Sequence, residues 1–140
     1  MPIRRIILEI KNDYSELDSL FEQLREFGHA LGAGEKALFQ MNLALEELVA
    51  NIISYGYTDC LEHSIRITVS HDDGVLYFSL EDDGIPFNPM LASPADRDTP
   101  VEERGIGKLG IHLAREFMRD LAYERKGNKN VLTFNKPIGD

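Results

Sequence analysis

Two alternating apolar segments, separated by a tight-turn signal, constrain the fold of this chain most strongly. Apolar residues occupy every second position of residues 64–71, and they do so again in residues 75–82. Side chains of a β-strand point alternately to the two faces of a sheet, so each segment predicts a strand with one buried face. Asp73-Gly74 between them is typical of a two-residue hairpin turn. The two segments therefore predict an antiparallel pair at the centre of the fold.

The other segments predict further strands and three helices. A short strand is expected over residues 4–11, and the final hairpin is expected from strands 121–125 and 130–136. Helical periodicity predicts three helices, with apolar positions at Leu17, Leu20, Phe21, Leu24 and Leu31, at Leu38, Met41, Leu45, Leu48, Ile52 and Ile53, and across residues 106–118. We expect an α+β fold, a two-layer sandwich in which three helices cover one face of a mixed, mainly antiparallel sheet.

Length, charge and cysteine content limit the classes of function. A chain of 140 residues with 43% hydrophobic content fits one domain over residues 1–140. Its net charge is -9, and its basic residues form no cluster, so we expect no direct binding of nucleic acid. Cys60 is the single cysteine, and the sequence shows neither a signal peptide nor a long apolar run. These features predict a cytoplasmic protein that does not enter a membrane.

In the second expected helix, Glu47 and Asn51 are four residues apart and so share one face. A carboxylate beside an amide could accept a proton from a hydroxyl or water and hold a hydrated Mg²⁺. The same spacing also fits an ordinary solvated helix surface. Glu46, about 100° around the helix, fits the solvated interpretation better.

The stretch "DDGIPFNP", residues 82–89, follows the second hairpin strand. Period-two alternation places Asp82 on the apolar face, whereas Asp83 falls on the opposite face and is expected to be an ordinary turn carboxylate. A carboxylate that faces an apolar pocket needs a hydrogen-bond donor, and the exocyclic amine of a purine would be one. The alternative is a carboxylate that accepts from the amides of its own turn. Gly84 permits either close backbone approach or a positive φ.

A third motif, "GIGKLG", contains Gly105, Gly107 and Gly110 and leads into the last helix. Backbone amides of glycines near a helix N-terminus can hold phosphate, and Arg104 and Lys108 could meet its charge. The dinucleotide-binding motif requires a preceding strand, whereas a proline-containing loop over residues 83–105 precedes these glycines. The four histidines (His29, His63, His71 and His112) show no metal-ligand spacing, and we expect no role for them.

Taken in order, "ALEELVANIISYGY", "DDGIPFNP" and "ERGIGKLGIHLAREFMRDLAYERKGNKNVLTFNK" resemble the ATP-binding anti-sigma-factor serine/threonine kinases of the RsbW and SpoIIAB type. These proteins belong to the GHKL superfamily and have the Bergerat ATP-binding fold. The resemblance covers essentially the whole chain. It rests on the combination of E-x-x-x-N, D-x-G-x-P-F, G-x-G-x-x-G and a final N-V-L-T.

The resemblance implies ATP and Mg²⁺ as ligands and a role for each matching residue. Glu47 would be the general base, and Asn51 would coordinate Mg²⁺. Asp82 would recognise the adenine amino group with Gly84 and Pro86 beside it, and Thr133 would lie near the adenine. An ATP lid would span about residues 85–105, and the phosphates would be held by a segment that contains Arg104, Gly105, Ile106, Gly107, Lys108 and Gly110. Pro86 replaces the second glycine of the histidine-kinase motif, and Lys108 stands where many relatives carry a small or apolar residue.

The resemblance also implies a function in transcription regulation by partner switching. Such a kinase phosphorylates a serine or threonine of a STAS-domain anti-anti-sigma protein, which competes with a sigma factor for the kinase, and relatives are often homodimers. An ATP-binding module that sequesters a regulator without appreciable transfer is a second hypothesis. A histidine kinase catalytic domain, a gyrase-like or chaperone-like ATPase, and a scaffold that binds no nucleotide are further alternatives.

Overall fold

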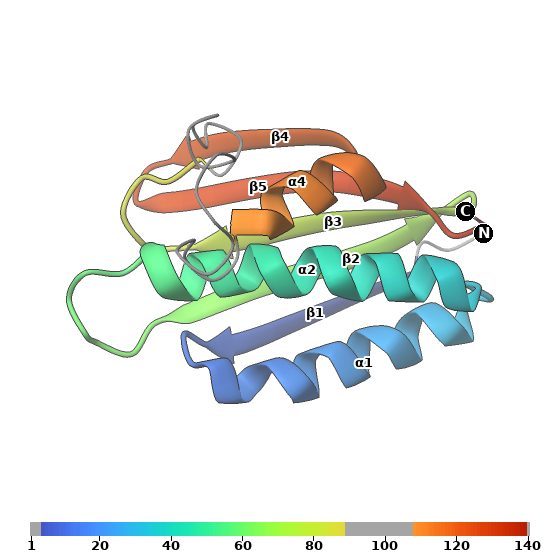
Figure 1. The fold of residues 1–140 in the computed structure, drawn as a ribbon, viewed down its shortest axis with the longest axis horizontal. Helices are drawn as coiled ribbons and strands as arrows, with labels where there is room; N and C mark the ends of the chain where they lie inside the picture. Colours follow the sequence, from blue (N-terminus) through green and yellow to red (C-terminus); the bar gives the residue numbers. More distant parts are fainter. Residues whose placement is uncertain (1–3, 89–107, 140) are drawn as a thin grey trace.

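The computed structural model describes residues 4–88 and 108–139 of the 140-residue chain. Nine elements follow one another in these segments, and Figure 1 shows their arrangement. They are β1 (Arg4–Lys11), η1 (Tyr14–Glu16), α1 (Leu17–Ala30), α2 (Glu35–Tyr55), β2 (Ser64–Asp72), β3 (Val75–Asp82), α4 (Lys108–Phe117), β4 (Arg119–Lys126) and β5 (Lys129–Pro137).

The five strands form one sheet in the order β1-β2-β3-β5-β4, and each of the four neighbouring pairs is antiparallel. The hairpin at Asp73-Gly74 joins β2 to β3, and a second hairpin joins β4 to β5. Asp73 and Gly74 both have positive φ, at 49° and 77°, as the tight turn requires. Strand β5 lies between β3 and β4 and runs antiparallel to β3, which places the end of β3 beside the start of β5.

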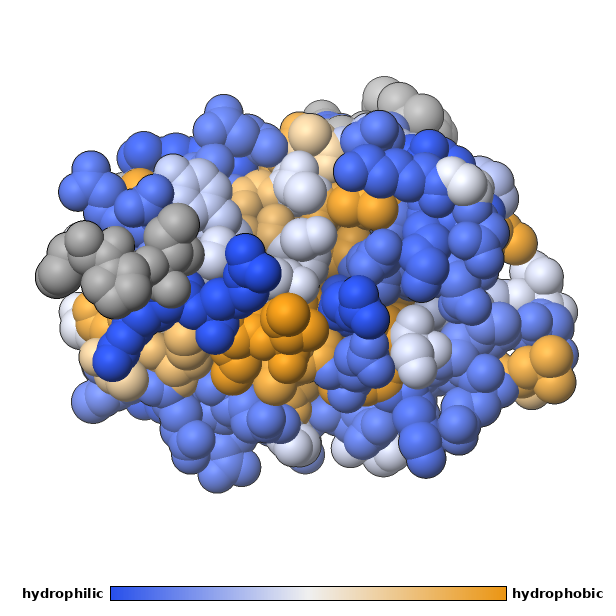
Figure 2. All heavy atoms as spheres, turned by 180° about the vertical axis from the view of Figure 1, so that it is seen from behind, coloured by the Kyte–Doolittle hydropathy of each residue, from blue (hydrophilic) through white to orange (hydrophobic). Residues whose placement is uncertain are grey.

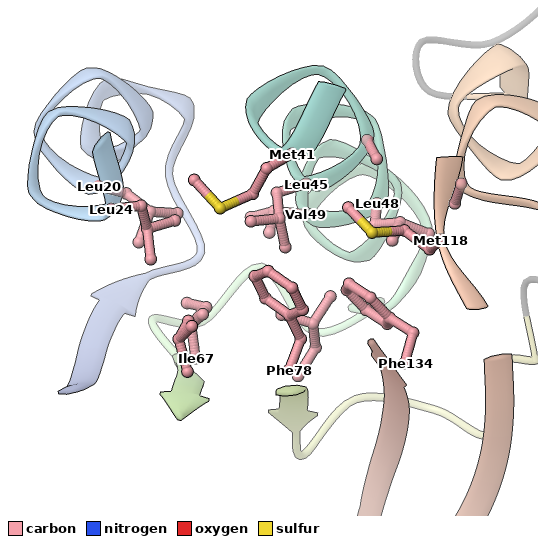
Figure 3. Close-up of a cluster of buried hydrophobic side chains, with 14 of the residues drawn as sticks. Leu20, Leu24, Met41, Leu45, Leu48, Val49, Ile67, Phe78, Met118 and Phe134 are labelled. Carbon is pink, nitrogen blue, oxygen red and sulfur yellow. The ribbon is translucent and has the colours of Figure 1, made fainter. Parts of the chain in front are cut away.

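Helices α1, α2 and α4 lie together on one face of the sheet (Figure 1). The core fills the space between the two layers, with side chains of α1 and α2 meeting those of β2, β3 and β5 (Figure 3). Leu45, Val49 and Ile67 are fully buried there, and Phe78 stacks on Phe134 with ring centroids 4.9 Å apart. The α+β sandwich with three helices on one face of an antiparallel sheet is therefore confirmed.

The view of the molecule from behind shows hydrophilic residues around a hydrophobic area at the centre (Figure 2). Thr68, Ser79 and Thr133 lie in one row across β2, β3 and β5, because they are register partners of the same parity. Ile7 and Tyr77 are exposed large hydrophobic residues of β1 and β3. Among the described residues, none of the helices has both the length and the apolar character that crossing a membrane requires.

Candidate functional site

The candidate site lies where β3 ends, at the edge of the core. Asp82 is the last residue of β3 and is only 5% exposed, because the alternation of the strand turns it to the same side as Phe78 and Leu80. Its Oδ1 atom accepts hydrogen bonds from the Gly84 backbone amide at 2.9 Å and from Asn130 Nδ2 at 3.0 Å. Burial raises the pKa of Asp82, and these two hydrogen bonds work in the opposite direction.

Asn130 connects Asp82 to the residues that follow it. Besides Asp82, its Nδ2 donates to the Ile85 carbonyl at 2.7 Å, while its Oδ1 accepts from the Phe87 amide at 3.2 Å and from the Tyr123 hydroxyl at 2.5 Å. Asn130 is 4% exposed, and both of its donors and its acceptor oxygen are engaged by the protein. Its amide is therefore fixed in orientation, and one of the two Asp82 oxygens is occupied by protein donors.

A narrow pocket lies beside Asp82. Its walls come from α2, β3, β4, β5 and the segment after β3, and they consist of Leu48, Ile52, Leu80, Asp82, Phe87, Tyr123, Asn130 and Leu132. Apolar side chains dominate this lining, and a single carboxylate stands among them. The cavity volume is about 10 Å³, which is room for about one water molecule. An amine donor at this place would satisfy the buried carboxylate.

Gly84 is required by a backbone contact rather than by a left-handed conformation. A Cβ atom at Gly84 would lie 2.2 Å from the Gly56 carbonyl oxygen and 2.9 Å from Asp82 Oδ1. The same Gly56 carbonyl accepts a hydrogen bond from the Ile85 amide at 2.8 Å. Of the two possibilities that the sequence left open, the structure shows close backbone approach. This contact fastens the turn after Asp82 to the C-terminal end of α2.

Glu47 and Asn51 lie on α2, on the same helix that provides Leu48 and Ile52 to the pocket. Asn51 is 1% exposed, so the solvated interpretation does not hold for it. Glu47 is half-buried, and burial together with the neighbouring Glu46 raises its pKa, whereas Glu46 is exposed. A carboxylate with a raised pKa is a better proton acceptor than a fully solvated one.

The structure places the remaining expected site residues as follows. Pro86 is exposed beside the pocket, and Lys108 and Gly110 belong to the first turn of α4. Arg104, Gly105, Ile106 and Gly107, together with most of the expected lid over residues 85–105, lie outside the described residues.

Thr133 does not join the pocket. It is exposed on the outer face of the sheet, where it pairs with Ser79, because its parity is opposite to that of Leu132 and Phe134. The expectation that Thr133 lies beside the adenine site therefore has to be corrected. Asn130 occupies the place on β5 that faces Asp82, and the two residues are direct register partners. Asn130 lies two and four residues before Leu132 and Phe134, on the same face of β5, and this alternation is the sequence signal that could have identified Asn130.

The described residues contain no group of three or more His, Cys, Asp or Glu side chains that could hold a metal ion. Mg²⁺ commonly binds through one or two protein oxygens together with substrate phosphates. Asn51, the residue expected to contact Mg²⁺, is buried on α2 one helical turn from Glu47.

Several known proteins are similar to this chain in sequence and in fold. The family model of the histidine kinase-like ATPase domain matches residues 10–136. The serine/threonine-protein kinase BtrW of Bordetella bronchiseptica is 26% identical over 95 residues, which cover 68% of this chain and 67% of that protein. The anti-sigma F factor of Bacillus subtilis is 24% identical over 87 residues, which cover 62% of this chain and 60% of that protein.

Among solved structures, the blue-light activated histidine kinase of Erythrobacter litoralis EL346 superimposes with a TM-score of 0.56 at 17% identity. The superposition covers 76% of this chain and 32% of that one. At this identity the likeness concerns the fold alone. The match to the anti-sigma F factor likewise spans less than two thirds of that relative's length.

Proposed function

Because this chain belongs to the family of histidine kinase-like ATPase domains, we propose that it binds ATP and transfers the γ-phosphoryl group to a serine or threonine of a partner protein. The observation that carries the proposal is the buried Asp82 carboxylate. Protein donors hold its Oδ1 atom, and the residue lines a pocket whose other walls are mainly apolar. We assign one domain to residues 1–140, with an ATP lid at about residues 85–105.

In this proposal Asp82 accepts a hydrogen bond from the exocyclic amine of adenine. The apolar walls from Leu48, Ile52 and Leu132 pack against the ring, and Gly84 and Pro86 shape the rim of the pocket. Keeping Asp82 ionised is essential, because a protonated carboxyl would no longer be a pure acceptor. The hydrogen bonds from Asn130 and the Gly84 amide favour the ionised form against the effect of burial.

The phosphates would extend from the pocket towards α2 and the start of α4. We propose that Asn51 ligates Mg²⁺ and that Glu47 accepts the proton of the attacking hydroxyl. The segment with Arg104, Gly105, Ile106, Gly107, Lys108 and Gly110 would hold the phosphates through its amides and positive charges. Bound Mg²⁺ supplies neutralisation of phosphate charge. The chain itself would position the nucleotide, accept one proton and exclude water.

Two relatives suggest the partners, since one is named a serine/threonine-protein kinase and another an anti-sigma F factor. We propose a STAS-domain anti-anti-sigma protein as the phosphoacceptor and a sigma factor as the competing ligand, in the cytoplasm and with a homodimer as the working form. Phosphorylation adds a charge of about -1.5 to -2 to the acceptor. Such a charge would weaken its contact with this acidic chain, whose net charge is -9.

Transfer of radiolabelled phosphate from ATP to a co-encoded STAS protein tests the proposal. We expect labelling of a serine or threonine by the wild type and its loss in Glu47→Ala. ATP binding without transfer by the wild type would contradict the kinase function and favour the alternative, an ATP-binding module that sequesters a sigma factor or another regulator. Labelling on histidine of this chain itself would indicate a histidine kinase domain instead.

A further inference from the structure

His63 lies between two carboxylates at the end of the sheet that holds the candidate site. Its Nε2 is 2.8 Å from Asp59 Oδ2, and its Nδ1 is 3.1 Å from Asp83 Oδ1. The ring also stacks on Tyr57, with ring centroids 4.5 Å apart and an interplanar angle of 21°. The His63 side chain is 17% exposed, whereas those of Asp59 and Asp83 are 45% and 36% exposed. The imidazole thus bridges two residues that are 24 positions apart in sequence.

The two bridged carboxylates belong to segments that already touch at the pocket. Asp59 lies in the connection from α2 to β2, and Asp83 directly follows the base-reading Asp82. These segments meet where the Gly56 carbonyl accepts from the Ile85 amide at 2.8 Å and closely faces Gly84. His63 therefore adds a side-chain link next to a backbone link, and both restrain the turn that donates the Gly84 amide to Asp82.

The charges of this link also affect the pKa of Asp82. Burial is the main cause that raises the pKa of Asp82, and the neighbouring charge of Asp83 adds to it. Burial and the charges of Asp82 and Asp83 likewise raise the pKa of Tyr57, on whose ring His63 stacks. A positive imidazole beside Asp83 would offset that negative charge and so favour the ionised, amine-accepting form of Asp82.

We propose that His63, in its protonated form, is a positioning residue for the purine pocket, because it ties Asp59 to Asp83 and so fixes the turn that holds Asp82. The proposal rests on the proposed nucleotide-binding function. It makes binding of the base sensitive to pH near neutrality, with tighter binding on the acidic side. Nothing in the spacing of His63 within the sequence indicates this role.

The chemistry of imidazole gives the direction of the effect. Protonated imidazole has two N–H donors, one for each carboxylate, whereas neutral imidazole has one donor and one lone pair. On deprotonation, one carboxylate would face that lone pair and the link would open. Hydrogen bonds to Asp83 and Asp59 raise the pKa of His63, so the link persists above the usual pKa of histidine.

The groups that face His63 come from three parts of the chain. The connection after α2 provides Asp59 and the Tyr57 ring, and the residue after β3 provides Asp83. From the segment after β1, Asn12 Oδ1 accepts from the His63 backbone amide at 2.9 Å and fixes the backbone of His63. Asp59 and Asp83 are the charged groups in this set, and both favour the protonated ring.

The test is the pH dependence of adenosine binding, measured by calorimetry between pH 6.0 and 8.5. Adenosine has no phosphate, so phosphate titration cannot produce the effect. For the wild type we expect the dissociation constant to rise about three- to tenfold over this range. A change of up to about one unit in the pKa of His63 on binding corresponds to at most about a tenfold change in affinity. His63→Gln should bind weakly and without this pH dependence. The control is His29→Gln, at an exposed histidine of α1, which should behave as the wild type.

A second measurement needs no variant. If protonation of His63 favours adenosine, adenosine must raise the pKa of His63 by the same linkage, and NMR titration of the ring proton reports this directly. An unchanged His63 pKa, or a wild-type profile and affinity in His63→Gln, would overturn this proposal while nucleotide binding stands. Failure of the wild type to bind adenosine and ATP at any pH would instead overturn the proposed function and, with it, the role of His63.

Discussion

Asn130→Ala should be costly, because Asn130 is the polar centre of the candidate pocket. The substitution removes four hydrogen bonds, to Asp82 Oδ1, the Ile85 carbonyl, the Phe87 amide and the Tyr123 hydroxyl. It leaves one charged and three neutral groups without their partner at a position that is 4% exposed.

The magnitude follows from these contacts. A hydrogen bond to a charged group contributes about 1.5–3 kcal/mol and a neutral one about 1 kcal/mol, which gives a sum of about 5 kcal/mol. Water can enter the space left by the amide and satisfy some of these groups, so we expect a net loss of about 3 kcal/mol in the free energy of unfolding. In a chain of this size that corresponds to a melting temperature lower by about 10 °C.

Urea denaturation followed by circular dichroism measures this loss. Thr133→Ala is the matched control, because Thr133 lies three residues along the same strand but is exposed on the outer face. We expect the control to change the free energy of unfolding by less than about 0.5 kcal/mol. Equal costs for the two variants, or a cost below about 1 kcal/mol for Asn130→Ala, would refute the assignment of Asn130 as the organising residue.

Three further perturbations test other parts of the site. Gly84→Ala should lower the free energy of unfolding by about 1–3 kcal/mol in urea denaturation, because the added Cβ atom would meet the Gly56 carbonyl oxygen. Gly139→Ala is the control, because the space around Gly139 is open. Equal losses of stability in the two variants would contradict the contact. Glu47→Gln should reduce phosphoryl transfer at least about 100-fold and leave ATP affinity nearly unchanged. Glu46→Gln, at the exposed neighbouring residue, is the control. Equal transfer by the two variants would exclude Glu47 as the base. The stability advantage of the wild type over His63→Gln should be greatest below pH 6.5 and should decline as pH rises through the raised pKa of His63; an advantage that grows with pH would contradict the bridge.

Local pattern was sufficient to predict the five strands and the three α-helices, but not the short helix η1. Alternation identified the β2–β3 hairpin, and the same reasoning placed Asp82 on the buried side, where it is 5% exposed. The pairing of β3 with β5 had no local signal, because it joins residues about 50 positions apart. The predicted start of the last hairpin, residue 121, was two residues late, since β4 begins at Arg119.

Side-chain partners were the part that the sequence could not supply. Asp83 was predicted to be an ordinary turn carboxylate, but it pairs with His63, the last residue of the α2–β2 connection. Asn51 illustrates the same limit, since spacing on a helix fixes which residues share a face but not which face is buried. The correction at Thr133 differs in kind, because the alternation of β5 was available in the sequence and points to Asn130 instead.

Calorimetric titration of ATP with Mg²⁺ into the wild type and Asp82→Asn tests the central claim most directly. Asparagine can keep its oxygen towards Gly84 and Asn130, which would place an amide donor where we propose that the other carboxylate oxygen accepts from the base. We predict saturable binding by the wild type and a dissociation constant at least about 30-fold higher for Asp82→Asn, since the loss of a charge-assisted bond costs about 2 kcal/mol or more. The variant should remain at least as stable as the wild type at neutral pH, because burial raises the pKa of Asp82 and its ionised form is the costly one above the ordinary value of 3.8. Equal affinity of the two proteins for ATP, or no binding by a folded wild type, would contradict the account.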